Sequence, residues 1–171
     1  MKTLVGATLF LLTASAVFAQ NSRAHSDIKT VTVNLINAEG QSVGTAVLSP
    51  ASTGVKIKLD IKNLSPGPHS IHIHQYAECD PPDFKSAGAH FNPDGHTHTG
   101  PPAGDIPDFS LMVSANGTAH VTAVAPYVTL GNDDHSVFSN GGTAIIIHAV
   151  AGAIGSAAPP RIACGVISRP N

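Results

Sequence analysis

The chain has 171 residues, a formal charge of −2 and only 12% charged residues. Its nine lysines and arginines are scattered along the sequence, which excludes the basic patch that nucleic-acid binding requires. The length is sufficient for one domain with a sizeable hydrophobic core. Ten histidines are a high count for a chain with so few charges, and they direct attention to metal binding.

The first 19 residues have the pattern of a secretory signal peptide. Lys2 supplies the positive start, residues 4–17 are mostly apolar, and Val17-Phe18-Ala19 fits a cleavage site before Gln20. The apolar run is too short and wrongly flanked for a stable membrane span, and no later stretch approaches twenty apolar residues. We therefore expect a periplasmic or secreted protein that begins near Gln20 and does not insert stably into a membrane.

A polar segment over residues 20–28, which we expect to be disordered, precedes a regular series of strand patterns. The clearest is Val-Lys-Ile-Lys-Leu-Asp-Ile at 55–61, where apolar and polar residues alternate with the period of two of a half-buried strand. Further strands are expected at 29–36, 43–48, 69–74, 109–113, 119–124, 143–150 and 161–168.

Gly, Pro and Asn turns separate these segments, and Asn116-Gly117 predicts a tight hairpin turn. About eight short strands without a sustained helical period predict an all-β antiparallel sandwich or barrel, formed as one domain over residues 29–171. Two long loops, 75–108 and 152–160, interrupt the strand rhythm, and loops of that length inside a compact domain are usually functional.

Histidines at a two-residue spacing are the strongest local indication of chemistry. His72 and His74 lie on a predicted strand, where side chains at i and i+2 share one face about 6.6 Å apart, so both imidazoles can bind one metal ion. Imidazole-rich sites suit copper and zinc. Further candidate ligands follow downstream: His90, His96, His98, Asp105 and His148.

The two cysteines, Cys79 and Cys164, most simply form one disulfide in a secreted chain. Two thiolate metal ligands are the alternative, which an oxidising compartment disfavours. The chain-entropy model values a bridge that closes so long a loop at about 4 to 5 kcal/mol.

Five separated motifs occur in an order that resembles the Cu/Zn superoxide dismutase family over essentially the whole mature chain. They are His72-Ile-His74, Ser86-Ala-Gly-Ala-His90-Phe-Asn-Pro93, His98 with Gly104-Asp105, His148, and Arg161-Ile-Ala-Cys164-Gly-Val-Ile167. The segment from Cys79 to Gly88 is similar to the bacterial branch. The resemblance implies an eight-stranded Greek-key barrel of immunoglobulin-like type with a long metal-binding loop.

The resemblance also implies a role for each matching residue. Four imidazoles match copper ligands: His72, His74, His90 and His148. Zinc would be bound by His90, His98 and Asp105, with His90 bridging the two metals and carrying a proton during the reaction. Arg161 would attract the superoxide anion, since a guanidinium is always charged and offers several donors. Cys79 and Cys164 match the family disulfide.

Three departures from the family pattern together point to an altered zinc site. The position of the third zinc histidine is Pro102, which cannot bind a metal. The acidic residue expected four positions after the last copper histidine is Gly152, and the loop over 149–160 has no charged residue. We therefore expect an altered or empty zinc site, as in copper-only members, with His96 as an alternative fourth ligand.

The leading hypothesis is copper-dependent dismutation of superoxide to dioxygen and hydrogen peroxide outside the cytoplasm, by a monomer or homodimer. The alternative is a dismutase-like protein that binds copper for storage or delivery with little turnover. The complete copper set and Arg161 favour the enzyme, whereas the altered zinc site favours the alternative.

Overall fold

The computed structural model describes residues 30–95, 101–107, 109–149 and 159–170. The predicted signal peptide and the segment 20–28 lie outside these residues, as do His96, His98 and Gly152. Helix in the described ranges is limited to two short 3-10 turns, η1 at Lys85–Ala87 and η2 at Ser139–Gly141. Within the same ranges, no helix has the length and apolar character needed to cross a membrane.

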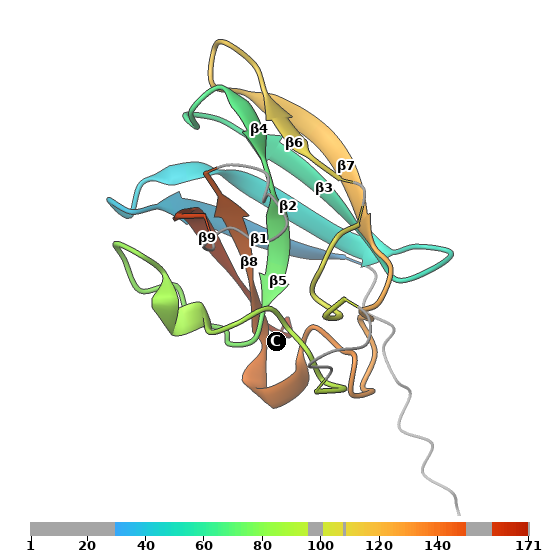
Figure 1. The fold of residues 1–171 in the computed structure, drawn as a ribbon. Coiled ribbons are helices and arrows are strands. Elements are labelled where there is room, and N and C mark those ends of the chain that lie inside the picture. The colour runs from blue at the N-terminus through green and yellow to red at the C-terminus, as the bar shows by residue number, and fades with distance from the viewer. Residues whose placement is uncertain (1–29, 96–100, 108, 150–158, 171) are drawn as a thin grey trace, which may run out of the picture.

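Nine antiparallel strands form in the described part of the chain, at or near the predicted positions, which confirms the all-β prediction. They are β1 Val31–Asn37, β2 Ser42–Pro50, β3 Val55–Ile61, β4 Gly67–His69, β5 Ile71–His74, β6 Leu111–Val113, β7 Ala119–Ala125, β8 Thr143–His148 and β9 Arg161–Ile167. Seven of them form one sheet in the order β5-β8-β9-β1-β2-β3-β7 (Figure 1).

The strand that carries the first two metal-site histidines changes partner at Ser70. Before that residue β4 pairs with β6, and after it β5 pairs with β8. β6 lies against β7, so the β4–β6 pair connects the two ends of the large sheet and gives the molecule its curled, barrel-like shape (Figure 1). Counted as one bent strand, β4 and β5 restore the expected number of eight.

The hydrophobic core follows the predicted alternation. In β3, Val55, Ile57 and Leu59 are fully buried, while the lysines between them are exposed. A smaller cluster of buried residues lies beneath the long loop and consists of Phe84, Ala87, Ala144, Ile146 and Cys164. The long loop is therefore fixed to the sheet by packing as well as by its covalent ends.

The predicted tight turn at Asn116-Gly117 is present, although it does not produce a simple two-stranded hairpin. Ser114 and Thr118 are joined across the turn by a 2.9 Å backbone hydrogen bond, and Gly117 has the positive φ of 79° that this turn requires. The flanking strands then pair with different neighbours, β6 with β4 and β7 with β3.

Candidate metal centre

Backbone hydrogen bonds attach the long loop to β5 and bring His90 beside His74. Gln75 N–H donates to the carbonyl of Ala89 at 2.9 Å, and Phe91 N–H donates to the carbonyl of Ile73 at 2.9 Å. These bonds make a short antiparallel bridge between His74 and His90. The histidine from the loop is consequently held almost as firmly as one on a strand.

Gly104 extends the same arrangement and places Asp105. Its N–H donates to the carbonyl of Phe91, and its own carbonyl accepts from Ile73, each at 2.8 Å. A Cβ at this position would lie 2.0 Å from the carbonyl oxygen of Ile73, so only glycine permits so close an approach. In the Gly104-Asp105 motif, close backbone packing thus requires the glycine, and the aspartate contacts His90.

His148 ends β8, where the pairing with β9 shifts register between Ile147 and His148. Its N–H donates to the carbonyl of Ser70 at 2.9 Å, which connects it to the turning point between β4 and β5. His69 holds the same residue from another side, with its Nδ1 2.9 Å from the carbonyl oxygen of His148 and its Nε2 2.8 Å from that of Ser65. His69 therefore tethers the end of β8 to the segment before β4.

The predicted copper ligands converge. One ligand atom from each of His72, His74, His90 and His148 lies within 4.8 Å of all the others. Four nitrogens around one ion, with bonds of about 2.0 Å, are separated by up to about 4 Å, so only a small closure is needed. Two elements of the sheet and one loop therefore supply a single four-imidazole centre.

Hydrogen bonding fixes which nitrogen of His74 and of His148 faces this centre. The Nδ1 of His74 lies 3.0 Å from the carbonyl oxygen of Gly88, and that of His148 lies 2.9 Å from the carbonyl oxygen of Pro159. A carbonyl only accepts, so each Nδ1 carries the proton and each Nε2 keeps its lone pair. Those Nε2 atoms, together with Nδ1 of His72, are buried and find no hydrogen-bond partner among the described residues.

Such unpaired buried nitrogens are costly unless a ligand satisfies them. A metal ion is the ligand that suits converging lone pairs on imidazoles, and a carbonyl that orients the ring from behind is the usual supporting arrangement. The residues present therefore fit a metal ion, and copper with four nitrogen ligands suits this set.

The protonation state agrees with that fit. Burial, reinforced by the nearby His90 and His148, lowers the pKa of His72 to about 4. Burial likewise lowers the pKa of His74 to about 3, against the opposing effect of the Gly88 carbonyl, and it lowers the pKa of His148. These three rings are neutral at pH 7, which is the form that binds metals.

The zinc half of the predicted site differs from the copper half. Nδ1 of His90 donates directly to Oδ1 of Asp105 at 2.5 Å. This is a hydrogen-bond distance, shorter than the roughly 3.3 Å that a tetrahedral angle imposes on two ligands of one zinc ion. Pro102 lines the cavity that also contains His90, and its side chain has no atom that can bind a metal ion. His98 and the alternative ligand His96 lie outside the described residues.

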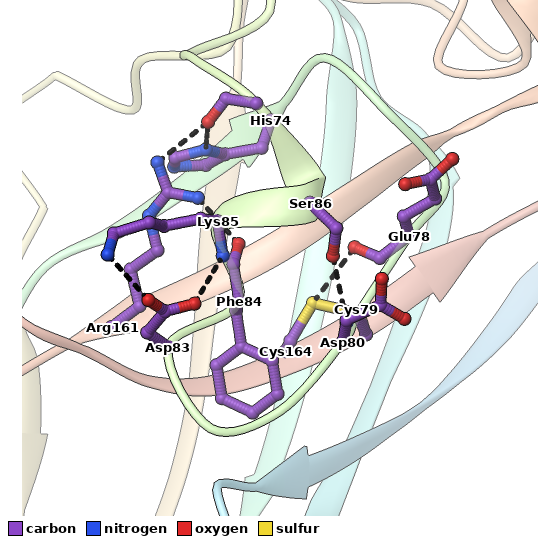
Figure 2. Close-up of a disulfide and its surroundings, with 11 residues drawn as sticks. His74, Glu78, Cys79, Asp80, Asp83, Phe84, Lys85, Ser86, Arg161 and Cys164 are labelled. Carbon is purple, nitrogen blue, oxygen red and sulfur yellow. Dashed lines mark hydrogen bonds and ion pairs between the residues drawn. A yellow bond between two sulfur atoms is a disulfide. The ribbon is translucent and has the colours of Figure 1, made fainter.

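Arg161 begins β9 and enters the cavity that contains the histidines. This cavity has a volume of about 580 Å³ and is lined by His74, His90 and His148 together with the arginine. The two terminal nitrogens of Arg161 donate to the carbonyls of Phe84 at 2.6 Å and Gly88 at 2.7 Å (Figure 2). These two bonds point a cation at the centre.

The disulfide between Cys79 and Cys164 is formed, with a Cα–Cα distance of 5.7 Å (Figure 2). The prediction of a bridge is therefore confirmed, and the alternative of two thiolate ligands is wrong. The bond joins the long loop to β9, the strand on which Arg161 lies. It thus closes the same loop whose carbonyls hold the guanidinium.

Sequence reasoning did not identify Gly88 and Phe84 as contributors to the site. Both act through carbonyl oxygens, which leave no trace in side-chain chemistry. The one available signal was the glycine at position 88, because glycine is the residue expected where φ is positive. Phe84 also has a positive φ of 53°, which an aromatic residue rarely adopts.

The fold and the centre together define a histidine-rich metalloprotein built on a curled antiparallel sheet. Residues 42–167 match the family model of copper/zinc superoxide dismutase (SODC). Superoxide dismutase [Cu-Zn] 2 of Aquifex aeolicus is 41% identical over 172 residues, covering 92% of this chain and 93% of that protein. The chain belongs to the copper/zinc superoxide dismutase family.

Solved structures agree with this assignment. A SOD-like protein from Bacillus subtilis, crystallised as a double mutant in which a tyrosine and a proline are replaced by histidine, is 33% identical with a TM-score of 0.73. The match covers 81% of this chain and 97% of that one. Cu/Zn superoxide dismutase from Brucella abortus is 28% identical with a TM-score of 0.65, covering 82% of this chain and 100% of that one.

Proposed function

We propose that His72, His74, His90 and His148 bind one copper ion and that the protein converts superoxide to dioxygen and hydrogen peroxide. The observation that carries the proposal is the convergence of buried imidazole nitrogens that lack a hydrogen-bond partner among the described residues. Membership of the copper/zinc superoxide dismutase family supports the reaction. A bound copper ion would supply the one-electron exchange that the reaction needs, which zinc alone does not.

The protein's own groups bind the substrate anion and hold a proton. Arg161 attracts superoxide into the cavity and orients it, because its guanidinium is charged at all relevant pH values and is already fixed by two carbonyls. His90 is placed to pass a proton to the substrate, since Asp105 accepts the hydrogen bond from its Nδ1 and fixes the orientation of the ring at the cavity. The peroxide product needs two protons, and this ring is placed to deliver one.

We further propose that zinc binds weakly and that the enzyme works chiefly with copper. Pro102 in the place of a ligand and the direct His90–Asp105 hydrogen bond support this reading. The SOD-like protein from Bacillus subtilis was also crystallised with histidine in place of a proline. In this chain, the exchange Pro102→His would add a histidine where the family resemblance implies the third zinc ligand.

An extracytoplasmic location is also proposed, with a mature chain that begins near Gln20 and one domain over residues 29–171. The signal-peptide pattern, the formed disulfide and the bacterial relatives support it. Cell fractionation followed by mass measurement of the mature protein tests both the compartment and the cleavage point.

Copper storage with little turnover is the second candidate, and the altered zinc half is the observation that favours it. The two functions separate when the copper-free protein is titrated with copper and superoxide decay is followed by stopped flow at each addition. For the enzyme, we expect the rate to rise linearly to one copper per chain and then to level off. Stoichiometric copper binding without a rate above that of the copper-free protein would instead establish storage.

A further inference from the structure

One oxygen atom connects the two functional parts of the cavity. The carbonyl of Gly88 accepts a hydrogen bond from Nδ1 of His74 at 3.0 Å and another from the guanidinium of Arg161 at 2.7 Å. Figure 2 shows the imidazole of His74 and the guanidinium of Arg161 side by side at this point. Any rotation of this peptide therefore moves a proposed metal ligand and the proposed anion-binding group together.

The direction of this carbonyl depends on an unusual backbone conformation. Gly88 has φ of 75° and ψ of −153°, a region that is essentially restricted to glycine. Glycine reaches this region easily, but it also leaves it easily because it has many other accessible conformations. Contacts around Gly88 must consequently keep the peptide in place.

The ring of Tyr76 supplies the closest of these contacts. A Cβ built on Gly88 would lie 2.7 Å from both Cδ2 and Cε2 of Tyr76, so the ring occupies the space beside the glycine Cα. The backbone of Tyr76 is fixed to the same segment, since its N–H donates to the carbonyl of Ala87 at 3.0 Å. Tyr76 is 46% exposed as a residue and does not belong to either buried core cluster.

We propose that Tyr76 is a positioning residue for the reaction. Its ring packs on Gly88 and holds the peptide whose carbonyl orients His74 and Arg161 at once. The inference rests on the proposed function, because it takes His74 as a metal ligand and Arg161 as the anion-binding group. Displacements of about 1 Å in such groups are sufficient to lower a reaction rate substantially.

A matched residue separates this role from that of an ordinary surface aromatic. Tyr127 is the second tyrosine of the chain and is 44% exposed, almost the same fraction as Tyr76. It is not among the nearest neighbours of Gly88, and its carbonyl accepts from Nδ1 of His135 at 2.8 Å. Truncating either tyrosine removes a similar exposed ring. Only Tyr76→Ala should change the site.

The test compares copper-loaded native protein with Tyr76→Ala, Tyr76→Phe, Tyr127→Ala and Arg161→Ala. Azide affinity, measured by optical titration of the cupric form, reports on anion binding, and the electron paramagnetic resonance spectrum reports on the orientation of the ligands. For Tyr76→Ala we expect azide binding weakened by about threefold or more, an altered spectrum and one retained copper per chain. Tyr76→Phe and Tyr127→Ala should match the native protein, because the proposed contact is made by ring carbons.

Native azide affinity and an unchanged spectrum in Tyr76→Ala would overturn the inference, as would a loss in Tyr76→Phe equal to that in Tyr76→Ala. Thermal unfolding of each variant verifies folding, and Tyr76→Ser replaces Tyr76→Ala if the latter aggregates. Arg161→Ala should weaken azide binding more than any other variant. If it does not, or if the native protein fails to bind copper, the proposed function is overturned and this inference with it.

Discussion

His72, His74 and His148 project from two paired strands, whereas Asp105 and Pro102 belong to the loop that follows His90. On the strand side, Nδ1 of His74 and of His148 each meets a backbone carbonyl, and Nε2 faces the centre. On the loop side, a carboxylate already contacts the imidazole that would otherwise bridge to a second metal.

The difference explains how the proposed copper ligands can stay in place while the proposed zinc side varies. Register and pleat fix the direction of a strand side chain, so a ligand on β5 or β8 cannot move without disturbing the core. A loop tolerates substitution more easily because fewer contacts depend on it. Pro102, at the position where the family resemblance implies a zinc histidine, is therefore compatible with an intact set of four imidazoles.

The largest effect is expected from His148→Ala on the strand side. Loss of one of four imidazoles should abolish dismutation and lower copper affinity at least tenfold, while the protein still folds. Stopped-flow superoxide decay and copper competition with a chelator measure the two effects. His120→Ala is the matched control, because His120 lies on the surface with its Nδ1 3.2 Å from the carboxylate of Asp60. An unchanged rate and copper content in His148→Ala would remove the ligand assignment.

Arg161→Ala should have the next largest effect, and it should leave the copper in place. The change removes anion attraction without removing a ligand, so we expect the rate to fall by about tenfold or more. Arg169→Ala is the control, since Arg169 lies over the Phe138 ring at 4.6 Å and bonds to Gly131, away from the histidines. Loss of copper in Arg161→Ala would show a structural role in place of the proposed one.

The strand side could be predicted from the sequence for the same reason that it is rigid. Alternation of isoleucine with His72 and His74 reports directly which side chains share a face, and the all-β fold follows from eight such segments. The disulfide followed from the count of two cysteines. These features are local, or involve residue types with few alternative roles.

Contacts made by backbone carbonyls could not be predicted in this way. The carbonyls of Gly88 and Phe84 are chemically identical to every other carbonyl in the chain, and only the folded loop brings them to Arg161. The division of the strand at Ser70 was also missed, because a change of partner alters neither composition nor period. The direct His90–Asp105 hydrogen bond depends equally on tertiary placement.

Breaking the disulfide should have a smaller effect on activity and a clear effect on stability. Cys79→Ser combined with Cys164→Ser removes a bond that closes a separation of 85 residues, which is worth about 4.5 kcal/mol in the chain-entropy model. We expect activity to fall by only a few fold, because the loop that carries the Phe84 carbonyl is also held by packing. Urea denaturation and superoxide decay measure the two effects. Equal stability with and without the bond would contradict the prediction.

The smallest effect on activity should follow zinc removal, and this tests the loop side of the comparison directly. With Pro102 in place of a ligand, we expect purified protein to contain less than one zinc per chain and to keep its rate when zinc is removed. Pro102→His should raise zinc content toward one per chain without a large change in rate. Mass spectrometry measures the zinc content, and superoxide decay measures the rate. If His96 completes the zinc ligands instead, the native protein should contain one zinc per chain and His96→Ala should release it. One tightly bound zinc in both the native protein and His96→Ala would contradict weak zinc binding and the role of His96 alike.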